Sequence, residues 1–464
     1  MKKEKLNYHR RLPHSIPIVL FCSVLLLVSA VGASCAEKLS LADSVKIAVE
    51  NNPTVQIAKE NLNKADAMER QAFAQGMPKV TLIGTYTRLD QVTAVSFGQE
   101  AFTIGSLETR SANLAVDQPI DAFGLVRTVK GLAKLNMCST EFGLDQAIND
   151  VTLDAKVAFF NIFRAEQFLK VQEDTVSQLK AHLKDAEARR QAGDATKFEV
   201  LRAETAVANA LQGLISSQNG VQLADSSFNT VLVRPIDAPV ELAEPSPPQY
   251  FTLGLEKVIA TAVKSRPELR QAGYLVDIDQ GLAKVARLQG KPTIGFRWNY
   301  NSSLDVSALN PRPSSWNALL SATIKLYDGG ATKANTDLAE SEANNARSTL
   351  ERLQDIVSLE AKQSYLSVKE DQERIVAAEK GLEMAKESAR LADVRYEGGV
   401  STQVEVLDAQ NALTLASTNY VNAMFDYQVA VARLERAVGG RGVLADLIAE
   451  SAKGSPATPA SGGK

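Results

Sequence analysis

The stretch ARLADVRYEGGVSTQVEVLDAQ, residues 389–410, places two glycines between two helical patterns. A weaker copy, RRQAGDATKFEVL, occupies residues 189–201. Reversal of a helix uses left-handed backbone conformations, which glycine adopts without a steric penalty. Both copies are therefore expected to form the turns of helical hairpins. The residues that return at one constant offset are Gly193 as Gly399, Thr196 as Thr402, Glu199 as Glu405, Val200 as Val406 and Leu201 as Leu407.

The repeat extends over most of the chain. Pro53 and Pro78 recur with equal spacing as Pro267 and Pro292, and a proline-rich stretch separates the two halves. Proline-rich chain is extended and semi-rigid, so this stretch is interpreted as a stiff linker. The expected organisation is a signal peptide at 1–36, a first repeat at 37–234, the linker at 235–250, a second repeat at 251–440 and a disordered C-terminal tail at 441–464.

The first residues have the order of a secretory signal peptide. A basic segment precedes an apolar run at 16–31, and small residues follow it. Cleavage after Ala36 is expected. Lipidation at Cys35 is the alternative, although Gly32 stands where a bacterial lipoprotein signal usually carries an aliphatic residue. No later window holds the ~20 uninterrupted apolar residues of a transmembrane helix, so any membrane crossing is expected to use strands.

The chain has too few histidines and cysteines for several kinds of catalytic, metal-binding and disulfide site. The chain has three histidines and three cysteines, and only His182 and Cys138 lie beyond the signal peptide. Histidine-based metal clusters, Ser/His/Asp or Cys/His catalysis and a disulfide framework therefore lack their residues, and no enzymatic activity or cofactor is expected. The net charge of −3 gives no global reason to bind nucleic acid. His182 lies in a polar helical stretch and is interpreted as a solvated residue.

Two proline-free regions, 120–234 and 314–455, can hold very long helices. In the second region, small and apolar residues alternate spacings of three and four, with one extra four at Ala361. This is the pattern of a coiled-coil seam with a single stutter. It predicts a helix from about Ala331 to Tyr396, ~100 Å long at ~1.5 Å per residue. The seam residues are Ala339, Ala343, Ala346, Leu350, Leu353, Val357, Ala361, Ser364, Val368, Asp371, Ile375, Ala378, Leu382, Ala385, Ala389 and Ala392.

Four segments outside the helical regions alternate apolar and polar residues. The clearest are 294–301 and 316–326, and weaker copies lie at 80–87 and 111–117. Period-two alternation predicts strands with one apolar and one polar face. Such strands, with aromatic residues near their ends, fit the wall of an outer-membrane barrel with a wet lumen, although a soluble half-buried sheet gives the same alternation. The aromatic residues expected at the membrane interfaces are Tyr86, Trp298, Tyr300 and Trp316.

Four strands cannot close a barrel alone. Open sheet edges are not tolerated in lipid, so several chains must contribute to one barrel. Two chains would give eight strands, whose interior is largely filled by side chains. Three chains would give twelve strands with room for a channel.

The glycine turns, the tandem halves, the paired hairpins and the prolines between helix and strand together resemble the TolC family of outer-membrane efflux proteins. The resemblance covers the expected mature chain up to about Gly440. It implies an α+β fold, the trimeric TolC-like α/β barrel. Twelve strands would form a barrel in the outer membrane, and twelve helices would form a coiled-coil tunnel across the periplasm. It further implies a passive exit duct for a tripartite efflux pump or a type I secretion system, with a periplasmic adaptor and an inner-membrane pump as partners.

The same resemblance implies where the duct opens and closes. In the family the glycine turns, here Gly193, Gly398 and Gly399, lie at the periplasmic tip. The residues that match the family's aperture are Glu199, Tyr396, Glu405 and Asp408. Ser401 stands where the best-known member has an arginine. The resemblance therefore implies that Arg395 or Lys197 replaces the missing salt link, or that the closed state is held more weakly.

A periplasmic coiled-coil adaptor without a membrane channel is the alternative function. Adaptors also carry helical hairpins, but usually a single one flanked by β-domains. This chain repeats both the hairpin and the barrel-like strands, which favours the duct.

Overall fold

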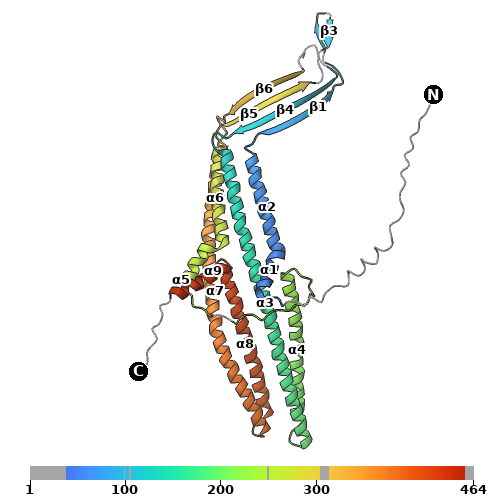
Figure 1. The fold of residues 1–464 in the computed structure, drawn as a ribbon, viewed down its shortest axis with the longest axis vertical. Coiled ribbons are helices and arrows are strands. Elements are labelled where there is room, and N and C mark those ends of the chain that lie inside the picture. The colour runs from blue at the N-terminus through green and yellow to red at the C-terminus, as the bar shows by residue number, and fades with distance from the viewer. Residues whose placement is uncertain are drawn as a thin grey trace, which may run out of the picture.

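We describe a computed structural model of the chain. It describes residues 38–454 apart from 93, 99, 104–105, 248–249 and 304–312. The expected signal peptide, the lipidation candidate Cys35 and the last ten residues lie outside the described residues. The molecule is long and narrow, with a β-sheet at one end and two helical hairpins at the other (Figure 1). No described helix is long and apolar enough to cross a membrane.

Two very long helices run along the molecule. They are α3 (Leu125–Ala192) and α7 (Ala331–Glu397), of 68 and 67 residues. At ~1.5 Å per residue each is about 100 Å long. The predicted helix in the second half is confirmed to within one residue, and every seam residue named above is buried or half-buried. The other helices are α1 (Leu41–Asn51), α2 (Pro53–Ala74), α4 (Lys197–Val231), α5 (Leu255–Ser265), α6 (Pro267–Leu288), α8 (Gln403–Ala437) and α9 (Arg441–Gly454).

The helices form one layer, and a different set of four helices makes up each half of it. Near the sheet, neighbours follow the order α2, α3, α6, α7, and near the tips they follow α4, α3, α8, α7. Helices α3 and α7 take part in both, because they span the whole length (Figure 1). Each repeat thus supplies to this layer one continuous helix and two shorter helices, one near the sheet and one near the tips. In the tip half of the layer, α4 and α7 form the two edges.

The sheet contains four antiparallel strands in the order β1 (Lys79–Arg88), β4 (Glu108–Ile120), β5 (Thr293–Ser303) and β6 (Ser314–Thr323). All four predicted strands are present, but β6 ends at Thr323, three residues before the predicted end at 326. A short hairpin of β2 (Ala94–Phe97) and β3 (Glu100–Thr103), which the sequence did not predict, lies between β1 and β4.

The register of the sheet separates an apolar face from a polar face. One cross-strand row joins Leu82, Leu114, Tyr300 and Trp316. Because side chains alternate along a strand, the neighbouring row points to the opposite side. On that polar side Asn299 donates to Asn317 at 2.9 Å, and further asparagine and Asp–Arg pairs link the strands. The sheet therefore has the two-sided character of a barrel wall, and β1 and β6 are its edges.

An ion network joins four helices at mid-height. Arg266, which precedes α6 and is 1% exposed, contacts Glu360 of α7 at 2.5 Å and Glu268 of α6 at 3.2 Å. Arg436 of α8 contacts Glu360 at 2.7 Å and Asp150 of α3 at 2.9 Å. Burial disfavours the ionised form of Glu360, but both guanidinium groups outweigh this and lower its pKa. The network lies at the predicted stutter, where the coiled-coil seam relaxes.

The expectation of disorder from residue 441 is wrong for residues 441–454. They form α9, whose Leu444 and Leu447 are buried against α5 and α8. An amphipathic helix with a docking face orders this stretch despite its small and polar residues. The linker begins with a turn, in which Ala238 donates its backbone N–H to the Pro235 carbonyl at 2.9 Å. Further along, Leu242 pairs with Leu39 in a parallel bridge that ties the start of the described chain to the linker.

Candidate functional site at the hairpin tips

Both hairpins end in the turns that the repeated sequence predicts. Gly193 has φ 91° and Gly399 has φ 74°, so both adopt the left-handed conformation that glycine permits. Gly398 has φ −73° and closes α7 in a right-handed conformation. The hydroxyls of Thr196 and Thr402 then cap α4 and α8 by accepting from the backbone three residues on. Each tip is thus a short, capped reversal of four to five residues.

Two acidic side chains near the start of α8 lie on an exposed face of the second tip. Glu405 and Asp408 are both exposed and three residues apart, which places them on one side of the helix. Ser401 donates its hydroxyl to Glu405 at 2.8 Å, and Arg395 approaches the same carboxylate at 3.8 Å. Arg395 therefore pairs with an acid within its own hairpin, whereas Lys197 is exposed at the first position of α4.

Arg189 links the two hairpins. It lies in the last turn of α3 and donates from Nη2 to the carbonyls of Tyr396 and Glu397, at 3.0 and 3.1 Å. These carbonyls belong to the last turn of α7, where the helix dipole favours a positive charge. The guanidinium also lies over the Tyr396 ring, 4.5 Å from its centroid, in a cation–π contact. One side chain of the first hairpin thereby caps the long helix of the second.

A second link joins the shorter helices. Gln403 of α8 is 5% exposed and donates to the carbonyl of Glu199 on α4 at 2.8 Å. The Glu199 carboxylate faces its own N-cap and completes a capping box with Thr196. We call Arg189, Tyr396, Gln403 and Glu199 the interhairpin latch. Because the latch joins residues from both halves of the repeat, it holds the two tips together within one chain.

The interpretation of His182 as a solvated residue is wrong. His182 is 8% exposed, and its ring lies 5.1 Å from that of Tyr396. Burial lowers its pKa, as does Arg189, whereas the carboxylates of Asp393 and Asp185 act in the opposite direction. Burial raises the pKa of Asp393 as well, and it also raises that of the Tyr396 phenol. The polar surroundings in sequence concealed a residue that another helix covers.

The structure brings together some of the predicted aperture residues and adds others. Glu199 and Tyr396 lie in the latch, whereas Glu405 and Asp408 lie beside it on the exposed face of α8. Arg189 and Gln403 were missed, because the partner of each lies on a helix that is distant in sequence. The signal that could have found Arg189 is its position in the last turn before a glycine turn, matched by Arg395 in the second copy.

The aromatic residues predicted at the membrane interfaces share one face of the sheet. Tyr86, Tyr300 and Trp316 lie toward the ends of their strands that are distant from the helices. Trp298 lies at mid-strand, with its ring 6.4 Å from that of Tyr300. Tyr300 and Trp316 are direct cross-strand partners, whereas Tyr86 lies on the edge strand β1, four residues beyond the row that they share with Leu82.

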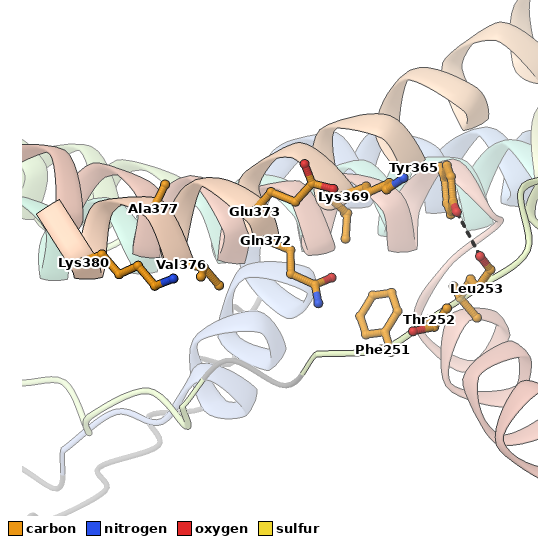
Figure 2. A pocket seen from close by; sticks show the side chains of 11 residues that line it. Phe251, Thr252, Leu253, Tyr365, Lys369, Gln372, Glu373, Val376, Ala377 and Lys380 are labelled. Carbon is orange, nitrogen blue, oxygen red and sulfur yellow. Dashed lines mark hydrogen bonds between the residues drawn. The ribbon is translucent and has the colours of Figure 1, made fainter. Parts of the chain in front are cut away.

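A groove of about 640 Å³ runs along α7 at mid-height (Figure 2). The chain that follows the linker crosses it, and Tyr365 donates its hydroxyl to the Leu253 carbonyl at 3.0 Å. Phe251, Gln372 and Glu373 line the open part. The hydrogen bond from Tyr365 to Leu253 attaches the start of the second repeat to α7. The groove lies far from the tips.

Comparisons with known proteins agree with this architecture. A sequence model of the outer membrane efflux protein family matches residues 45–231 and 258–440. The chain belongs to the outer membrane efflux protein family. This membership confirms the resemblance, and it identifies an efflux channel of the outer membrane with a helical tunnel in the periplasm. The two matched segments correspond to the two tandem halves, which disfavours the adaptor alternative.

Individual members of the outer membrane efflux protein family are similar over most of their length. Outer membrane protein OprJ of Pseudomonas aeruginosa is 24% identical, over 85% of this chain and 83% of OprJ. Nodulation protein T of Rhizobium leguminosarum bv. trifolii is 23% identical, over 86% and 85%. The solved CmeC outer membrane channel of Campylobacter jejuni has a TM-score of 0.76 and 17% identity, covering 89% of each chain. VceC of Vibrio cholerae has a TM-score of 0.75 and 18% identity, covering 86% and 96%. The TolC-like fold is confirmed.

Proposed function

We propose that three copies of this chain form the exit duct of a tripartite efflux pump or type I secretion system. Solutes would enter between the hairpin tips and leave through a barrel in the outer membrane. A periplasmic adaptor and an inner-membrane pump would deliver them and supply the energy. The observation that carries this proposal is a four-stranded sheet, apolar on one face and open at both edges, mounted on helices about 100 Å long.

The sheet edges support closure by copies of the same chain. In lipid the unpaired backbone groups of β1 and β6 need partners, and the β6 edge of one copy can supply them to the β1 edge of the next. These two strands run antiparallel, as neighbours in such a barrel do. Three copies give about twelve strands, which leaves an open lumen.

The helical layer has matching edges. The α4 edge exposes large apolar side chains such as Ile215 and Leu223, which are 59% and 72% exposed. The α7 edge exposes Met384 and Val394, at 68% and 53%. Apolar side chains in such rows are usually covered by a partner, and joining α7 of one copy to α4 of the next would cover both rows. The same closure that completes the barrel would thus complete the tunnel.

In this arrangement the hairpin tips form the gate. We propose that the latch sets the closed state, and that Glu405 and Asp408 from three copies present a ring of six carboxylates to the pore. Such a ring favours cations. The aromatic side chains of Tyr86, Tyr300 and Trp316 would mark the membrane interface distant from the helices.

Conductance in planar bilayers tests the proposal. The purified trimer should pass current with a preference for cations, and the double variant Glu405→Ala, Asp408→Ala should lose most of that preference. The matched control is Asp446→Ala, Glu450→Ala, which removes two exposed acids of equal charge from the peripheral α9. A well-folded parent that passes no current would refute the duct.

A further inference from the structure

His182 occupies an unusual position for the one histidine of the sequence beyond residue 36. It lies on α3, but its ring packs against Tyr396 of α7, so the imidazole is enclosed between the two hairpins. The side chain is 8% exposed, and its Nε2 atom has no hydrogen-bond partner among the described residues. A buried polar atom without a partner is costly, which suggests a role other than packing.

We propose that His182 is a proton-operated release for the interhairpin latch. The neutral imidazole fits between the hairpins and lets Arg189 cap α7. The imidazolium favours separation of the hairpins, because separation returns the charge to water. Acid on the periplasmic side thus shifts the gate toward its open state. This inference rests on the proposed duct function and assigns a regulator to its gate.

The charges around His182 set the direction of the effect. Arg189, on the same helix, repels an imidazolium, and it is also the residue that caps α7. Asp185 of α3 and Asp393 of α7 attract an imidazolium, and Gln410 of α8 donates to Asp393 at 3.5 Å. Glu199 of α4 acts on the Tyr396 phenol rather than on the histidine. Burial is the largest influence, and together with Arg189 it outweighs the two carboxylates, so the pKa of His182 is lowered.

The sign of the linkage follows from that balance. The packed tip has the lower pKa for His182, and the separated tip has the ordinary one near 6.5, so the separated tip binds the proton more tightly. The packed tip is favoured above the ordinary pKa and loses this advantage as the pH falls below it. Each pKa unit of difference corresponds to about a tenfold preference per site. Three copies around one axis multiply the effect.

A polar cavity gives the proton a route to this cluster. It has a volume of about 420 Å³ and lies between α3, α7 and α8. Thr175 and Thr414 line it and share a hydrogen bond of 3.0 Å, and Gln178 contributes a further polar group. Asp393 lines the cavity and also acts on His182. Water can therefore reach the neighbour of the histidine while the hairpins stay packed.

The test records channel current in planar bilayers while the chamber facing the tips is titrated from pH 8 to pH 5.5. The parent current should rise severalfold, with a midpoint below 6.5. The current of His182→Gln, which keeps a polar side chain without a titratable ring, should be independent of pH over this range. A second variant, Asp393→Asn, removes an attracting carboxylate, so its midpoint should move to lower pH.

The outcomes distinguish failure of the proposed role of His182 from failure of the proposed duct. A parent current that falls or stays constant on acidification overturns the release and leaves the duct intact. A His182→Gln variant that keeps the rise also overturns it. If His182→Gln fails to assemble, Asp393→Asn decides, because an unchanged or higher midpoint contradicts the role of the histidine. No current from the folded parent at any pH refutes the duct itself.

Discussion

Replacement of Arg189 by alanine is the sharpest test of the interhairpin latch. The change removes two hydrogen bonds from a charged donor to the Tyr396 and Glu397 carbonyls, together with the cation–π contact. Hydrogen bonds to charged groups contribute about 1.5–3 kcal/mol each and an exposed cation–π contact about 0.5–1 kcal/mol. Since Arg189 is half-exposed and water competes for both hydrogen bonds, we discount the sum below the low end of these ranges, to about 2–3 kcal/mol in total.

That energy corresponds to about a 30- to 150-fold shift toward separated tips in each subunit. Single-channel recording of Arg189→Ala at neutral pH should show a large rise in open probability or conductance. Arg190→Ala removes the same charge from the adjacent, exposed position and should behave like the parent. Arg189→Lys keeps the charge but loses the planar fork, so its effect should be intermediate. Equal currents for Arg189→Ala and Arg190→Ala would refute the latch.

Three further predictions concern the turn, the sheet and the ion network. Gly399→Ala forces a side chain into a left-handed conformation and should lower the free energy of unfolding by about 1–2 kcal/mol, whereas Gly381→Ala, inside α7 with open space around it, should raise it by about 0.5–1 kcal/mol in the same denaturant titration. Leu82→Arg places a charge on the apolar face and should abolish trimers on unheated gels, and Thr81→Arg on the opposite face should not. Glu360→Gln should destabilise the protein at pH 7 by about 2 kcal/mol, allowing for the partial exposure of the carboxylate. Because the pKa of Glu360 is lowered in the folded state, this deficit should persist above the ordinary value of 4.5 and close as the pH falls below it; a deficit that stays constant in acid would contradict the network.

Much of the fold could be predicted because its elements are long and regular. The seam from Ala339 to Ala392 is periodic over many turns, so the position of α7 follows from spacing alone. The four strands followed from alternation, and the glycine turns followed from the requirement for positive φ at Gly193 and Gly399. These features depend on residues that are close together in the sequence, so one sequence is enough to predict them.

The parts that could not be predicted depend on contacts between distant segments. His182 looks solvated beside Lys180 and Lys184, and only the approach of Tyr396 from α7 encloses it. The role of Gln403 likewise becomes visible only through the hydrogen bond that it donates to the Glu199 carbonyl of α4. The helix α9 was missed because its small and polar residues conceal a narrow apolar face that is stabilised by docking.

The central claim is that copies of this chain close edge to edge into a hollow cylinder. Oxidative cross-linking tests it most directly in a Cys138→Ser background, with one cysteine at Thr81 on β1 and a second placed in turn at Ser315, Asn317 or Ser321 on β6, all on the polar face. The account predicts that at least one pair forms bonds between copies and that the ladder of products on a denaturing gel ends at three subunits. A product that remains a single chain with every pair, or a ladder that continues beyond three, would contradict it.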